Sequence, residues 1–154
     1  IDVLEHVFKN KIENTLFAGI YNEEIFRELK NKKNKIIIKD SISKKKISIS
    51  IDKFYLKNDN AIVTSNNNTI IFTKYRKPFH YLSDFKELNI NLKKYKILIV
   101  KSGYLSPELK KLKADNFMIL TDGFVTQDFK RIKNLFREKP IYPFQKNFRY
   151  NIAI

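Results

Sequence analysis

Two short polar segments, each directly after an apolar run, carry the side chains best suited to chemistry. Lys101-Ser102-Gly103-Tyr104 follows the apolar run 97–100, and Thr121-Asp122-Gly123 follows the run 117–120. Together they supply an ammonium group, two hydroxyls, a phenol and a carboxylate, which can bind charged and polar groups of a ligand. The sequence therefore predicts a substrate-binding site formed by Lys101, Ser102, Tyr104 and Asp122.

The elements around these segments would bring them together. The two apolar runs are typical of buried strands, and Ser106-Pro107-Glu108 between them is typical of a helix start, with a Ser cap and Pro at the first helical position. A strand, a helix and a second strand in this order predict a right-handed βαβ unit with parallel strands. Because ligands favour the carboxyl ends of such strands, both polar segments would lie at one edge of the sheet.

The rest of the chain predicts further strands and helices that complete one domain. Strands are expected at 16–19 and 36–38, a half-buried strand at 47–51, and a hairpin over 61–73 that turns at Asn66-Asn67-Asn68. Helices are expected near the N-terminus, after Asn22, around 83–88 and after Thr126. We expect an α/β fold over residues 1–154: a mixed sheet, with the C-terminal parallel βαβ unit and helices packed on it.

Each candidate residue also has a purely structural explanation. Lys101 can be one of many surface lysines, Asp122-Gly123 is a common turn dipeptide, and Tyr104 can pack under the helix that follows. His80 stands among aromatic residues and is typical of a hydrogen-bonded structural histidine. No Ser/His/Asp arrangement and no His-x-x-x-His spacing is present, so the residues predict a binding edge without a complete catalytic machinery.

Composition narrows the classes of function. The 154 residues suffice for about one domain. Lys and Arg number 31 against 16 Asp and Glu, giving a net charge of +15, but most of the cations are lysines, whereas base and phosphate recognition favours Arg. The absence of Cys excludes disulfides and thiolate zinc sites, and 2 His argue against a His-rich metal site. No apolar run or signal peptide points to a membrane, so we expect a cytoplasmic protein.

Most of the chain resembles one known family in the order of its motifs. The sequence is similar to the C-terminal region of the microcystinase C-like (MlrC) proteins, and the resemblance is carried by Ile97-Leu98-Ile99-Val100-Lys101-Ser102-Gly103-Tyr104, Pro107-Glu108-Leu109, Ile119-Leu120-Thr121-Asp122-Gly123 and Lys139-Pro140-Ile141-Tyr142-Pro143. The resemblance implies a hydrolase that uses zinc to degrade linear peptides. In that family the metal ligands lie in a larger N-terminal domain, which this chain lacks.

The resemblance and the composition together give three hypotheses. In the first, the chain is the accessory C-terminal domain of an MlrC-like zinc metallopeptidase: it forms one wall of the substrate cleft, binds no zinc itself and is inactive alone. Its partners are then the N-terminal metal-binding domain, in the same protein or a separate chain, and a peptide substrate. In the second, the chain is a stand-alone interaction module that diverged from the enzyme. A basic nucleic-acid-binding protein, suggested by charge alone, is the third and least favoured.

Overall fold

The computed structural model describes residues 1–31, 34–40, 44–102, 104 and 106–119. The chain divides into a first unit, Ile1–Asn116, and a second unit, Phe117–Ile154. Every described helix and strand belongs to the first unit. The expectation that residues 1–154 form one domain stays a prediction, because only Phe117, Met118 and Ile119 of the second unit are described.

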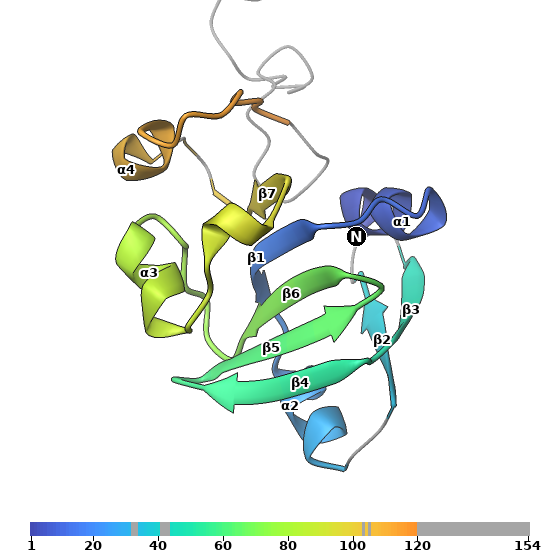
Figure 1. The fold of residues 1–154 in the computed structure, drawn as a ribbon. Coiled ribbons are helices and arrows are strands. Elements are labelled where there is room, and N and C mark those ends of the chain that lie inside the picture. Colours follow the sequence, from blue (N-terminus) through green and yellow to red (C-terminus); the bar gives the residue numbers. More distant parts are fainter. Residues whose placement is uncertain (32–33, 41–43, 103, 105, 120–154) are drawn as a thin grey trace, which may run out of the picture. The chain divides into compact units, whose positions relative to one another are not determined.

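A five-stranded mixed sheet forms the centre of the first unit (Figure 1). Its strand order is β4-β5-β6-β1-β7, and the strands are Lys53–Lys57 (β4), Asn60–Ser65 (β5), Asn68–Thr73 (β6), Thr15–Tyr21 (β1) and Ile97–Val100 (β7). The first three are an antiparallel meander, whereas β6 and β7 both run parallel to β1. This arrangement confirms the predicted α/β class with a mixed sheet.

Two hydrophobic cores cover the two faces of this sheet. On one face lie the helices α1 (Asp2–Lys9) and α2 (Glu23–Lys30) and the separate hairpin β2–β3 (Lys35–Lys39, Lys46–Ser50). Their buried side chains meet alternate residues of the sheet, among them Phe17, Ile70 and Phe72. On the other face, Leu16, Ala18 and Ile71 pack with residues of α3 (Leu82–Glu87) and α4 (Pro107–Lys110). Because both faces are covered, β1 and β6 are buried almost throughout, and their central residues are apolar, as is usual for strands covered on both faces.

Local sequence accounts for the turns and helix starts. Both hairpins of the meander close on two residues with positive φ, Asn58-Asp59 and Asn66-Asn67, which is the geometry of a type I′ turn. Asn and Asp tolerate this left-handed conformation better than other side chains. At the start of α2, the Asn22 side chain accepts a hydrogen bond from the backbone N–H of Ile25 at 3.3 Å, as the predicted cap requires.

The predicted C-terminal βαβ unit is present only in part. The first strand and the helix are β7 and α4. Phe117, Met118 and Ile119 lie in no strand, so the second strand is not formed by these residues, and residue 120 and the helix expected after Thr126 lie outside the described residues. The parallel partner of β7 is β1, since Leu16 and Ala18 pair with Leu98 and Val100. An apolar run alone predicts burial, not which strand it pairs with.

A glycine in the middle of β1 allows the chain after β6 to pack closely on the sheet. Gly19 has a φ of +84° at a bulge between Ala18 and Ile20. A Cβ at this position would lie 3.3 Å from the ring of Phe79 and 3.5 Å from the carbonyl oxygen of Lys77. Glycine is therefore required here both for its backbone conformation and for the close approach of Phe79.

Gly19→Ala is expected to lower the free energy of unfolding by about 1–2 kcal/mol, the usual cost of a left-handed conformation for a residue with a side chain. Urea unfolding followed by circular dichroism measures it. Ser48→Ala on the exposed face of β3 is the control, and it should change the free energy by less than about 0.5 kcal/mol. Equal stability of the Gly19→Ala variant and the original chain would contradict the role given to Gly19.

Candidate functional site

The carboxyl ends of β6, β1 and β7 meet at one edge of the sheet, because these three strands are parallel. Tyr21 at the end of β1 pairs with Thr73 at the end of β6, and Val100 at the end of β7 pairs with Ala18. The segments 74–81 and 101–104 therefore leave the sheet on the same side. We call this region the carboxyl edge.

Asp84 holds the backbone of the segment after β6 in place. Its Oδ2 accepts hydrogen bonds from the backbone N–H groups of His80, at 3.1 Å, and Tyr81, at 2.9 Å. Its Oδ1 lies 3.0 Å from Nζ of Lys77. The Asp84 side chain is only 10% exposed, so these contacts satisfy a carboxylate that would be costly to bury alone. The side chain of Phe79, the residue before His80, is fully buried and also anchors this segment.

The half-buried imidazole of His80, on the segment after β6, contacts Ser102 and Tyr104, which follow β7. Its Nε2 lies 3.1 Å from Oγ of Ser102, and its Nδ1 lies 3.1 Å from the hydroxyl of Tyr104. The rings of His80 and Tyr104 are also in contact, with centroids 4.8 Å apart and planes tilted by 51°. We call these three side chains the His80 cluster.

The protons of the His80 cluster can be placed from its hydrogen bonds. The Ser102 hydroxyl donates its one proton to the carbonyl oxygen of Tyr104 at 2.6 Å. Toward His80 it can then only accept, so Nε2–H of His80 is the donor. Nδ1 of a neutral imidazole is left as an acceptor for the Tyr104 hydroxyl. The serine is thus not activated by a base, and the His80 cluster is a binding arrangement rather than a nucleophile with its base.

The helix α4 is tied to the same segment. The Ser106 hydroxyl donates to the carbonyl oxygen of His80 and accepts from the backbone N–H of Leu109 at 3.4 Å, which confirms Ser106 as the cap of α4. Glu108 accepts from the backbone N–H of Leu82 at 2.7 Å. These contacts hold the start of α4 against the start of α3.

Two cations, Lys101 and Arg76, also lie on the segments that leave the carboxyl edge. Lys101 donates its backbone N–H to Ala18 at 3.2 Å, and its side chain is exposed. Among the described residues, its ammonium group has no ion-pair partner. The guanidinium of Arg76 lies 5.1 Å from the ring centre of Tyr21, within the range of a cation–π contact. The carboxyl edge therefore presents at least one exposed ammonium group, that of Lys101.

The structure brings together two of the four predicted site residues. Ser102 and Tyr104 are in direct contact, and Lys101 lies beside them in sequence, at the same edge. Asp122 lies outside the described residues, so its convergence with the others stays a prediction. His80 is hydrogen-bonded, as expected from the sequence, but its partners, Ser102 and Tyr104, are two of the predicted site residues, and these contacts were not predicted. The missing information was the parallel pairing of β6 with β1, which sends the segment carrying His80 to this edge.

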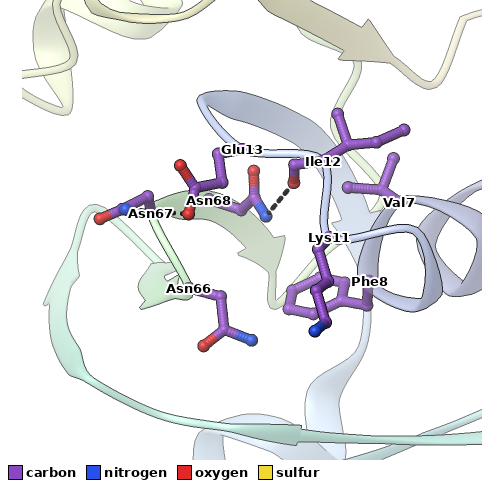
Figure 2. Close-up of a pocket in the computed structure, with 8 residues that line it drawn as sticks. All are labelled: Val7, Phe8, Lys11, Ile12, Glu13, Asn66, Asn67 and Asn68. Carbon is purple, nitrogen blue, oxygen red and sulfur yellow. Dashed lines mark hydrogen bonds between the residues drawn. The ribbon is translucent and has the colours of Figure 1, made fainter.

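A hollow of 380 Å³ lies away from the carboxyl edge, at the amino end of the parallel strands (Figure 2). It lies between the turn after α1 and the β5–β6 hairpin, and is lined by Val7, Phe8, Lys11, Ile12, Glu13, Asn66, Asn67 and Asn68. Figure 2 shows the Asn68 side chain donating to the carbonyl oxygen of Ile12, at 2.8 Å. The same side chain accepts from the backbone N–H of Thr15 at 2.9 Å. The Asn68 amide thus joins the turn to the hairpin, and we assign it a structural role.

The described residues form neither a metal-ligand cluster nor a membrane-spanning helix. In the part of the chain that the structure describes, no three His, Asp or Glu side chains come together as metal ligands. We therefore derive no step through zinc from these residues. No helix among the same residues is long and apolar enough to cross a membrane.

The fold and the carboxyl edge define an α/β domain with a basic, hydrogen-bonding surface where parallel strands end. A family model described as the MlrC C-terminus matches residues 43–134. Because the match covers more than half of the 154 residues, the chain belongs to the MlrC C-terminal family, which confirms the resemblance seen in the sequence. No curated protein matches the chain.

The His80 cluster predicts a defined imidazole tautomer. In the neutral form of His80, ¹⁵N NMR should show the proton on Nε2 and Nδ1 unprotonated. The chain has 2 histidines, so His6→Ala assigns the two sets of signals. Tyr104→Phe removes the donor to Nδ1 and should shift that nitrogen while leaving His6 unchanged. A proton on Nδ1 of neutral His80 would contradict the network.

Proposed function

We propose that this domain forms one wall of the substrate cleft of an MlrC-like zinc metallopeptidase that acts on linear peptides. In this proposal, zinc is held by an N-terminal metal-binding domain, in the same protein or in a separate chain. Membership of the MlrC C-terminal family supports the type of enzyme. The single observation that carries the position of the cleft is the His80 cluster at the carboxyl edge, next to the exposed Lys101, whose ammonium group has no ion-pair partner among the described residues.

The residues of the carboxyl edge would divide the work of binding a peptide. The exposed Lys101 ammonium would bind a peptide carboxylate, since a charged donor gives the stronger hydrogen bonds. The Tyr104 hydroxyl donates to His80 and keeps a lone pair that can accept from a peptide N–H. Ser102 already donates to one group and accepts from His80 and from the backbone N–H of Tyr104, so it would act by positioning Tyr104. Asp122 joins this proposal on its sequence position alone.

The first test uses the protein that contains this chain in its source cells. An affinity tag on the chain allows that protein to be isolated, weighed by mass spectrometry and analysed for zinc. We expect zinc to accompany the protein or its partner, and linear peptides to be hydrolysed in a chelator-sensitive manner. A metal-free preparation without peptidase activity would contradict the proposed enzyme and favour the interaction module instead.

Lys101→Ala in the isolated enzyme is expected to lower kcat/KM for a linear peptide by about tenfold to a hundredfold, the effect of one lost charged hydrogen bond. The matched control is Lys86→Ala, which removes an exposed lysine on α3. The effect should fall mainly on KM, because Lys101 is proposed to bind the substrate and not to take part in the chemical step. An unchanged kcat/KM would exclude Lys101 from the cleft.

A further inference from the structure

Among the strands that the structure describes, β4 forms one edge of the main sheet and pairs only with β5. Its sequence is Lys-Phe-Tyr-Leu-Lys, and its three central side chains are unusually exposed for large apolar residues. The exposed fractions are 38% for Phe54, 42% for Tyr55 and 44% for Leu56. An edge strand with exposed apolar side chains can accept a further strand from another chain.

The register of the hairpin shows which backbone groups of β4 are free. Lys57 and Asn60 flank the two-residue turn, and in this type of hairpin they exchange hydrogen bonds. Because bonded and non-bonded pairs alternate, Tyr55 and Lys53 also bond to β5, whereas Phe54 and Leu56 point their N–H and C=O groups away from it. In the described part of the chain, no hydrogen bond engages these outward groups.

The strand is held firmly from its other face. The hydroxyl of Tyr55 donates to the carbonyl oxygen of Leu88, at the end of α3, at 2.8 Å. Burial, and secondarily the nearby phenol of Tyr95, raises the pKa of Tyr55. Phe54 and Leu56 point to the opposite face, because side chains alternate along a strand. The free edge is therefore ordered before any partner binds, which reduces the entropy cost of adding a strand.

Charge determines which kind of strand can be added. Lys53 and Lys57 stand at the two ends of β4. If two copies of β4 paired antiparallel about Tyr55, each Lys53 would lie opposite the Lys57 of the other copy, and like charges in that position are destabilising. Lysines of this kind protect an edge against self-association. The same two lysines would form cross-strand ion pairs with acidic residues placed at both ends of an incoming strand.

We propose that the free edge of β4 binds an extended segment of another protein. In this five-residue segment the first and last residues are acidic, and the second and fourth are apolar. The outward N–H and C=O groups of Phe54 and Leu56 pair with the backbone of this segment. Its two acidic side chains lie opposite Lys57 and Lys53, and its apolar side chains lie beside Phe54 and Leu56. The net charge of +15 on the chain favours such an acidic partner. This inference is independent of the peptidase proposal.

The probe is the capped peptide Glu-Val-Thr-Val-Glu, added to the ¹⁵N-labelled 154-residue chain. We expect the largest NMR shifts along β4, and slower hydrogen exchange of the Phe54 and Leu56 amides. The peptide Val-Glu-Thr-Glu-Val has the same composition, and Lys-Val-Thr-Val-Lys has the opposite charge. Both should bind about tenfold or more weakly, because each loses the two end ion pairs. Equal binding of the two acidic peptides would show unspecific attraction and overturn the proposal.

Two variants separate backbone pairing from charge. Leu56→Pro removes an outward N–H without touching a bond to β5, and proline is tolerated on edge strands, so binding should fall about tenfold with the sheet intact. The double variant Lys53→Glu, Lys57→Glu should bind Lys-Val-Thr-Val-Lys more tightly than Glu-Val-Thr-Val-Glu. A misfolded variant would lose binding of both peptides and would not show this reversal. Retained preference for the acidic peptide in the double variant would overturn the proposal. So would a stable dimer of the original chain that buries β4.

Discussion

The parallel pairing of β1 with both β6 and β7 is the constraint on which the rest of this structure depends. It buries both faces of β1, and so requires helices or a hairpin on each side of the sheet. It also gives three chain segments a common exit at one edge. The His80 cluster exists because two of those segments, after β6 and after β7, leave the sheet side by side.

The bulge at Gly19 links this constraint to the site. Without a side chain at that point, Phe79 can pack directly over β1 and bury its ring completely. His80 follows Phe79 in the chain, and Asp84 fixes its backbone. The imidazole then reaches Ser102 and Tyr104 on the far side of β1. The packing of one buried ring thus positions the His80 cluster. Within the cluster, the Tyr104 hydroxyl keeps a lone pair for a ligand, and the exposed Lys101 ammonium lies next to it in sequence.

Most elements of the fold could be predicted from local patterns, whereas their pairing could not. The apolar run of β7, the paired runs of β5 and β6 and the cap at Asn22 are local signals, and the structure confirms them. The strand β4 was missed because its apolar side chains are exposed and show no buried face. The hydrogen-bond partners of His80 could not be predicted, for a different reason. Its contacts depend on which strands lie next to each other, and no local pattern specifies the order of strands in a sheet.

The central claim is that the carboxyl edge faces the peptide in the assembled enzyme. Photo-crosslinking tests this claim directly, with p-benzoylphenylalanine placed at Tyr81, which is 59% exposed and adjacent to His80, or at Ile37, which is 47% exposed on the separate hairpin. The account predicts that a linear peptide attaches at position 81, is displaced by unlabelled peptide, and does not attach at position 37. Equal attachment at both positions, or none at position 81, would contradict it.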